Sequence, residues 1–282
     1  AGAMLKSSLG FLVLAFAFFL CFIMCTGSYV YFQFVQQWPP TTCRLSTKPS
    51  NKHRPLQNFT IHGLWPSNYP NPKMPSNCAG SQFKKILSPK LLTKLKRSWP
   101  DVEKGNDTEF WESEWNKHGT CSEQTFNQMQ YFKRSHEMWS SYNITDILKN
   151  ASIVPSATQT WTYSDIVSAI KTVTQTTPLL RCKPYPAQPK GHPAQRKSPP
   201  KPQLLHEVVL CYDYNALKQI DCNRTAGCHN QKPISFQKIT VVWFLSHNKV
   251  VWFRMAIVNK IKMNDCTYNL GKKKKKKKKK KK

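Results

Sequence analysis

Acidic residues are scarce in this chain of 282 residues: Asp and Glu number 14 against 43 Lys and Arg, a formal net charge of +29. This balance favours a partner that carries negative charge. The positive charge is unevenly distributed: lysine fills positions 272–282 without a break, and residues 29–237 have a net charge of about +13. Hydrophobic residues make up 40%, which excludes a wholly disordered chain, and the length suits one domain of about 200 residues.

Paired CxxC motifs are absent, which argues against a zinc site, and we expect neither a metal nor another cofactor. Three of the ten cysteines lie outside residues 29–237. The remaining seven are Cys43, Cys78, Cys121, Cys182, Cys211, Cys222 and Cys228. Seven cysteines permit three disulfides and one free thiol, a pattern typical of secreted proteins.

The N-terminal segment predicts the compartment. Residues 9–25 are apolar apart from Gly10, and small residues follow at 26–28, so we predict a signal peptide over 4–28 after three leader residues, 1–3. A retained membrane anchor is the alternative, but the stretch is short and no basic cluster follows it. Five Asn-x-Ser/Thr sequons agree with secretion: Asn58, Asn106, Asn143, Asn150 and Asn223. We therefore expect an extracellular glycoprotein that no longer contacts a membrane.

The C-terminal lysine run has two explanations. Because AAA encodes lysine, an in-frame reading of a messenger's poly(A) tail would produce it, and residues 238–271 would then be translated untranslated sequence. The alternative is a genuine basic tail that binds nucleic acid or anionic lipid. We favour the first explanation, in which 238–282 form no domain and residues 29–237 are a single domain.

The order of predicted strands and helices favours an α+β fold with a central antiparallel sheet packed against several helices. Aromatic and β-branched stretches predict strands over 29–38, 59–65 and 204–212. Helical patterns follow Ser88, cover 109–118 and 122–140, and begin again at Ser164. Strands and helices do not alternate regularly, so a parallel βαβ sheet is not expected.

One segment, 183–203, departs from this order because it has seven prolines, five basic residues and no acid. It contains PAQPK at 186–190 and PAQRK at 193–197, which indicates a small duplication. The composition predicts an extended, exposed loop. Such an insert could contact RNA or a partner, or be only a solvated insertion.

The residues suited to chemistry fall in two short stretches, FTIHGLWP at 59–66 and FWESEWNKHGTC at 110–121. Glu114 and His118 are four residues apart on a predicted helix and so share a face, with Lys117 beside them. His62 lies on a predicted strand before Gly63, which permits close approach of another group. Two histidines and a cation suit cleavage of RNA without a metal, because one imidazole can accept a proton while the other donates one.

Each of these residues also has an ordinary structural explanation. A single histidine in an aromatic strand is more often packed in a core, and a Glu and a His four apart on a helix are usually a surface pair. The tryptophans of the two stretches are more often core residues than platforms for bases. Spacing alone therefore supports the nuclease hypothesis only weakly.

The two stretches closely resemble the active-site segments of the secreted ribonucleases of the T2 family. Three flanking segments are similar to the S-ribonucleases of rose-family plants: YFQFVQQWPPTTC, NITDILKNASIVPSATQTWTYSDI and LLHEVVLCYDYNALKQIDCNRTAGC. The resemblance covers about residues 29–237. It implies an α+β fold with an antiparallel sheet and a 2′,3′-cyclic phosphate product. By match, His62 is the general acid, His118 the general base, Glu114 and Lys117 support the transition state, and Trp65 and Phe110 contact bases.

The resemblance also implies disulfides between Cys78 and Cys121, Cys182 and Cys228, and Cys211 and Cys222. The partner of Cys43 in relatives comes a few residues later, but positions 48–51 hold no cysteine here, so we expect Cys43 to be the odd thiol. Ser113 replaces a histidine of many relatives, which puts a phosphate contact in doubt. The insert after Cys182 is longer than in the family.

The resemblance implies a secreted, monomeric endoribonuclease for single-stranded RNA. In the pistil, such an enzyme is the female determinant of self-incompatibility and enters pollen tubes, where pollen F-box proteins are the expected partners. The loop 67–83 matches a region that varies between alleles. The alternative is a catalytically silent basic glycoprotein for storage or RNA binding, which retention of the full set His62, Glu114, Lys117 and His118 argues against.

Overall fold

The computed structural model describes residues 29–46, 56–68, 74–85, 88–185, 201–223, 227–238, 242–246 and 249–253. The expected signal peptide, positions 186–200 of the proline-rich insert and most of the tail beyond 238 lie outside these residues. None of the described helices combines the length and apolarity needed to cross a bilayer.

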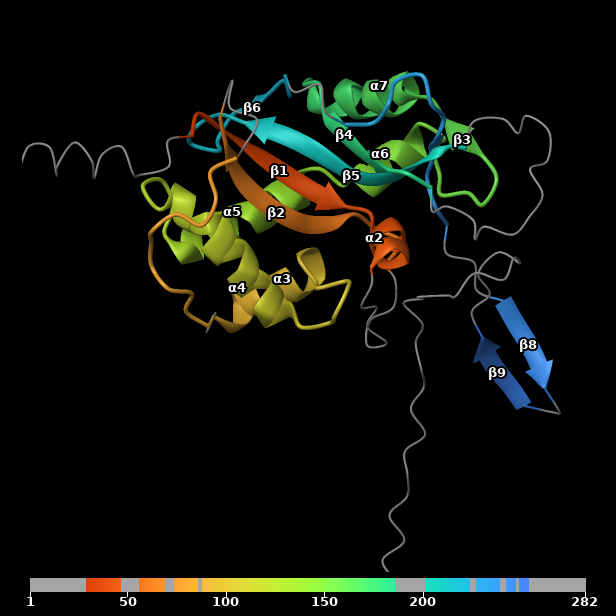
Figure 1. Ribbon diagram of the computed structural model, residues 1–282, viewed down its shortest axis with the longest axis horizontal. Helices are drawn as coiled ribbons and strands as arrows, with labels where there is room; N and C mark the ends of the chain where they lie inside the picture. The colour runs from red at the N-terminus through yellow and green to blue at the C-terminus, as the bar shows by residue number, and fades with distance from the viewer. Residues whose placement is uncertain are drawn as a thin grey trace, which may run out of the picture.

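A seven-stranded sheet forms the centre of the molecule (Figure 1). Its strands are β1 (Tyr31–Gln37), β2 (Thr60–Ser67), β3 (Thr160–Trp161), β4 (Leu179–Lys183), β5 (Gln203–Tyr212), β6 (Gln219–Ile220) and β7 (Ile234–Ser235). The order is β2-β1-β5-β7-β3, and β4 and β6 also pair with β5. The expected α+β fold is confirmed.

The strand pairs of this sheet are antiparallel, as expected, with one parallel exception. β7 runs parallel to β5, with Ile234 opposite Gln203. The reason is connectivity: β6 turns back against the end of β5, and the chain then returns to the beginning of β5 before β7 starts.

Seven helical segments surround this sheet among the described residues. They are α2 (Pro39–Leu45), α3 (Pro89–Ser98), α4 (Asp107–Lys117), the 3-10 helix η1 (Gly119–Ser122), α5 (Gln128–Ser141), α6 (Ile144–Asn150) and α7 (Tyr163–Thr174). Ser88 caps α3 as its motif predicts, by accepting from the backbone N–H of Leu91. Thr162 caps α7 in a capping box with Asp165, so that helix begins one residue earlier than expected.

Two helix predictions need correction. The helix expected to run on from Ser122 instead begins at Gln128, because Asn127 and Gln130 form a capping box that fixes the start there. The prolines 39 and 40 do end the first strand, but they also start α2, where the fixed φ of proline suits the first helical turn.

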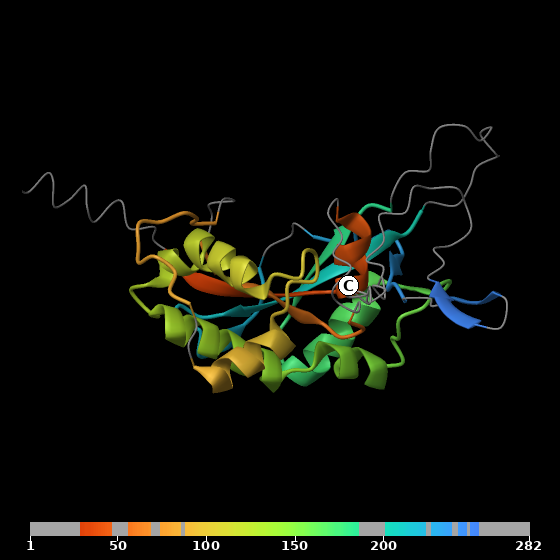
Figure 2. The same ribbon diagram turned by 90° about the horizontal axis from the view of Figure 1, so that it is seen from below.

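The two faces of the sheet are different. On β1, Phe32 and Phe34 point into the main core, which α3, α5, α6 and α7 cover, and Figure 2 shows these helices in a row along one side of the sheet. Tyr31 and Val35, on either side of these two residues, point to the other face and belong to a smaller apolar cluster there. Gln33 lies between them on this second face and is fully buried. The second face therefore combines a small apolar cluster with buried polar groups.

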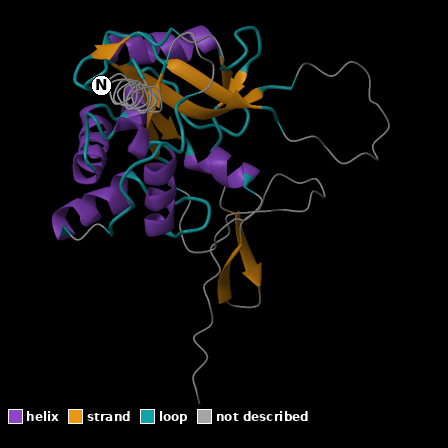
Figure 3. Ribbon diagram, turned by 60° about the vertical axis from the view of Figure 1, so that its left-hand side comes forward, coloured by secondary structure: helices purple, strands orange, loops and turns teal. Residues whose placement is uncertain are grey.

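Strands β8 (Val242–Ser246) and β9 (Lys249–Phe253) form a separate antiparallel pair. In Figures 1 and 3 this hairpin lies apart from the main sheet. It falls within residues 238–282, the segment that we predict to be translated untranslated sequence.

Three disulfides link the pairs expected from the resemblance: Cys78 with Cys121, Cys182 with Cys228, and Cys211 with Cys222. The expectation that Cys43 is a free thiol is wrong, because Cys43 is also disulfide-bonded.

Candidate active site

His62 lies in a β-bulge. Along the β1–β2 ladder, Val35 is opposite Gly63 and Gln36 is opposite Ile61, so His62 is an extra residue without a partner on β1. A bulge re-aims side chains and is common beside active sites. The imidazole is 29% exposed and lies on the second face of the sheet.

A carboxylate from the central strand holds this imidazole. Nδ1 of His62 is 2.5 Å from Oε1 of Glu207 on β5, and Oε2 of Glu207 accepts from Arg181 on β4 over 3.1 Å. Burial opposes the charged imidazole, but the Glu207 carboxylate outweighs it, and the pKa of His62 is raised above 6.5. Burial alone would raise the pKa of Glu207, yet the charges of His62 and Arg181 hold it well below its usual range.

Trp65 brings the two halves of the site together. Its ring centroid lies 5.0 Å from the imidazole of His62, edge to face, and 5.0 Å from that of His118, in a stacked arrangement. The indole N–H donates to Oε2 of Glu114 on α4 over 2.8 Å. Gly63 makes this possible, because a Cβ at that position would lie 2.1 Å from the indole nitrogen and 2.3 Å from the carboxylate.

His118 caps the C-terminal end of α4, and its backbone N–H donates to Glu114 over 2.9 Å. The side chain is buried, and its Nδ1 has no hydrogen-bond partner among the described residues. Burial, together with the positive charges of Lys117 and His62, lowers the pKa of His118 to about 3. This imidazole is therefore neutral at the pH of most biological fluids.

The other residues expected at the site lie around these histidines. Glu114 is 5% exposed, and burial raises its pKa against the opposing effect of His62. Lys117 is exposed at the end of α4, and the ring of Phe110 is 6.0 Å from His62. Ser113, where many relatives have a histidine, is exposed.

A disulfide and a backbone hydrogen bond hold the segment before α3 against the end of α4. Cys78 is bonded to Cys121, and the N–H of Asn77 donates to the carbonyl of Lys117 over 2.8 Å. Residues 74–83 belong to the loop expected to vary between alleles, so part of that loop is packed directly beside His118.

Beside His62 there is a pocket of 160 Å³. Phe110 and His206 line it together with charged residues of both signs, among them Asp101 and Lys183. Burial lowers the pKa of His206 to about 4. Asp101 uses its carboxylate to accept from the backbone of residues 103, 104 and 106, which shapes the wall of the pocket.

The arrangement combines two imidazoles whose protonation differs. The environment of His62 favours the charged form, and that of His118 favours the neutral form, so one can donate a proton while the other accepts one. Among the described residues, no group of three or more His, Cys, Asp and Glu is placed to hold a metal ion.

Sequence reasoning did not identify Glu207, Arg181 or His206. Glu207 and His206 had a detectable signal, because they are adjacent ionisable residues in a largely apolar strand, LLHEVVLCY. Arg181 carries no comparable signal, since only the register of β4 with β5 places it opposite Glu207.

The five sequons differ in their surroundings. Asn106 and Asn143 are N-caps of α4 and α6, and Asn150 is exposed at the end of α6. Asn58 is half-buried and accepts from the hydroxyl of Thr145, while Asn223 is exposed.

Comparison with known proteins gives a consistent result. The family model described as the Ribonuclease T2 family matches residues 29–222. The chain is 36% identical to Ribonuclease MC of Momordica charantia over 70% of this chain and 97% of that protein. It is 32% identical to Ribonuclease S-2 of Antirrhinum hispanicum, over 76% and 85% respectively. Among solved structures, Japanese pear S3-RNase is 30% identical with a TM-score of 0.60, covering 73% of this chain and 99% of that one.

Proposed function

We propose that this chain, which belongs to the ribonuclease T2 family and is a ribonuclease, is secreted and cleaves single-stranded RNA through a 2′,3′-cyclic phosphate. In this proposal His118 is the general base and His62 is the general acid. The opposite pKa directions of these two neighbouring imidazoles are the observation that carries this proposal.

In the first step the neutral His118 takes the proton of the ribose 2′-hydroxyl, and the 2′-oxygen attacks phosphorus. The bond from phosphorus to the 5′-oxygen breaks, and the charged His62 gives a proton to that oxygen. Each imidazole then has the protonation state that the hydrolysis of the cyclic phosphate requires, in which water replaces the 5′-hydroxyl. Lys117 supplies positive charge near the phosphoryl oxygens.

The surface and the aromatic residues suit single-stranded RNA. The net charge of about +13 on residues 29–237 attracts phosphates without regard to sequence. Phe110 lies beside His62, is only half-buried, and offers a ring face for stacking of an unpaired base, whereas Trp65 is buried between the two histidines. Attraction through charge predicts that affinity falls as salt rises.

An assay with purified secreted protein tests this function. We expect release of 2′,3′-cyclic phosphates from single-stranded RNA in the presence of EDTA, and loss of that activity in His118→Ala. His229→Gln is a matched control, since His229 is an exposed histidine outside the site. RNA that is bound but left intact by the unaltered protein would instead support the silent glycoprotein.

The biological role that we propose is that of the pistil determinant of self-incompatibility. Two observations support it: the similarity to Ribonuclease S-2 and to Japanese pear S3-RNase, and the loop segment 74–83 packed beside His118. Ribonuclease MC is more similar to this chain, at 36% identity against 32% for Ribonuclease S-2, so sequence similarity does not decide the role and the test must be biological. We expect the protein in styles and its uptake by pollen tubes, where pollen F-box proteins are the proposed partners. Equal amounts in leaves and seeds would contradict this role.

A further inference from the structure

Glu207 is a buried carboxylate that the proposed chemistry does not itself use. It lies in the middle of β5 and is 4% exposed. In the register of the sheet it is opposite Gln37 of β1 on one side and Arg181 of β4 on the other. An acid at such a position is costly unless it is paired, so its partners indicate its role.

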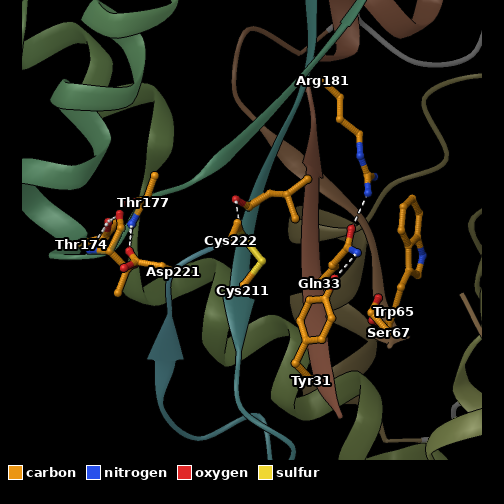
Figure 4. Close-up of a disulfide and its surroundings, with 12 residues drawn as sticks. Tyr31, Gln33, Trp65, Ser67, Thr174, Thr177, Arg181, Cys211, Asp221 and Cys222 are labelled. Carbon is orange, nitrogen blue, oxygen red and sulfur yellow. Dashed lines mark hydrogen bonds between the residues drawn. A yellow bond between two sulfur atoms is a disulfide. The ribbon is translucent and has the colours of Figure 1, made fainter. Parts of the chain in front are cut away.

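Both oxygens of this carboxylate are engaged. Oε1 accepts from Nδ1 of His62, and Oε2 accepts from Arg181. Arg181 is itself fixed on its other side, as Figure 4 shows: it donates to Gln33, which in turn donates to the hydroxyl of Tyr31 over 2.9 Å. Its guanidinium also lies 5.1 Å over the ring of Trp65. Four neighbouring strands therefore contribute to one chain of contacts that ends at His62.

We propose, on the premise of the acid–base function above, that Glu207 is a positioning residue for His62. Its carboxylate holds Nδ1–H, so that Nε2 is the ring nitrogen that exchanges a proton with RNA. Arg181 holds the second oxygen and keeps the carboxylate in this orientation. The bulge at His62 gives the imidazole its direction, and Glu207 fixes its rotation.

The proton balance of the reaction is consistent with this arrangement. When Nε2 of the charged His62 gives its proton to the leaving 5′-oxygen, the ring keeps its Nδ1–H on Glu207 and becomes neutral. Nε2 is then free to accept a proton from the water that attacks the cyclic phosphate. No proton passes to Glu207, which stays a carboxylate throughout.

Other charged groups also act on His62, and they must be separated from Glu207. Glu114 on α4 favours the charged imidazole, whereas Arg181 on β4 disfavours it. His118 and His206 face the same region, and the environment keeps both neutral. Lys183 lines the adjoining pocket. Of these groups, only Glu207 bonds directly to the imidazole.

Two substrates distinguish positioning of the acid from a general structural role. One is a dinucleoside monophosphate, whose 5′-oxygen needs a proton to leave. The other is a nucleoside 3′-(4-nitrophenyl phosphate), whose phenolate leaves without one. We expect Glu207→Gln to lower kcat/KM for the dinucleotide by about 10-fold or more, and to leave the aryl ester within about 3-fold of the unaltered enzyme. Equal losses on both substrates, or no loss on either, would overturn the proposal.

Three further variants complete the design. His62→Ala should show the same dependence on the leaving group; if it does not, the assignment of His62 as the acid fails, independently of Glu207. Glu137→Gln removes a carboxylate from an exposed ion-pair cluster on α5 and should change neither substrate. The double variant Arg181→Gln/Glu207→Gln removes the buried carboxylate and its partly exposed arginine partner. It should repeat the pattern of Glu207→Gln, which would show that an unpaired arginine does not cause that pattern.

A measurement without substrate keeps the inference testable even if folding is weakened or the acid assignment fails. Titration of the His62 Cε1–H resonance by NMR gives the pKa of this imidazole directly. Glu207→Gln should lower that pKa relative to the unaltered protein, and Glu207→Asp should restore part of the difference because the charge is retained. An unchanged His62 titration in Glu207→Gln would contradict the contact.

Discussion

Trp65 donates its indole N–H to Glu114 over 2.8 Å, and this bond joins the strand that carries His62 to the helix that ends at His118. Both imidazoles lie against the same indole ring, so the position of Trp65 determines how the acid and the base are placed relative to each other. Glu114 is thus buried as the partner of Trp65.

Trp65→Phe tests this role. The variant removes the N–H donor together with part of the buried ring, and loss of the hydrogen bond to Glu114 alone should cost about 1–3 kcal/mol in the free energy of unfolding. We also expect kcat to fall, because the two histidines lose their shared support. Trp139→Phe is the control, since Trp139 donates to the backbone of Phe59 away from the site. If both variants lose the same activity, Trp65 has no special role.

Local patterns in the sequence predicted the elements that carry the site, because caps and alternation act within a few residues. Ser88 begins α3 as expected, and the strands that hold His62 and Glu207 lie where aromatic and β-branched residues gather. The motif residues His62, Glu114 and His118 were likewise found from sequence, and the structure places them around Trp65.

The rest depends on pairing between distant residues. The bulge at His62 exists only in relation to β1, and the contact of Glu207 with Arg181 exists only in the register of β5 with β4. The hydrophobic periodicity of a single strand cannot show the bulge or this contact, because that periodicity does not depend on which strand lies beside it. The start of α5 at Gln128 does have a local cause, the capping box at Asn127, but the prediction followed the apolar pattern, which begins earlier.

The disulfide between Cys78 and Cys121 closes 43 residues, whereas that between Cys211 and Cys222 closes 11. Chain entropy predicts that replacing the first pair by serine costs about 4 kcal/mol and the second about 3 kcal/mol. Only the first adjoins His118, so we expect its loss to reduce kcat as well. Urea unfolding and RNA cleavage measured on both double variants would check this. Equal kcat values in the two variants would contradict it.

The pH dependence of kcat/KM should follow the two histidines. Activity requires neutral His118 and charged His62, so it should fall as pH drops through the pKa of His118 at about 3 and as pH rises through the raised pKa of His62. Lys117→Met removes a charge that lowers the pKa of His118, so the acid limb should move to higher pH. Lys149→Met, at an exposed position on α6, is the control. An acid limb that does not move in Lys117→Met would contradict this.

The mass of the protein from its natural source tests the prediction for residues 238–282. If those residues are translated untranslated sequence, the polypeptide freed of glycan should end near Gln237 and should begin near Tyr29. A mass that includes Lys282 would instead establish a basic tail that belongs to the protein. Recombinant chains that end at 237 and at 282 provide the two reference masses.

The stability of the protein should depend on pH through His118. Its pKa is about 3 in the folded protein and 6.5 in the unfolded chain, so between these values the unfolded chain binds the extra proton. The free energy of unfolding should therefore fall as pH decreases from 6.5, by at most about 1.4 kcal/mol per unit from this group. The pKa values of His62 and Glu114 are raised, so these groups act in the opposite direction. The measured slope of the unfolding free energy against pH is therefore the sum of several contributions. Subtracting the slope of His118→Asn, measured by urea unfolding from pH 4 to 7, isolates the contribution. Parallel curves for the two proteins would show that His118 is not buried as a neutral group.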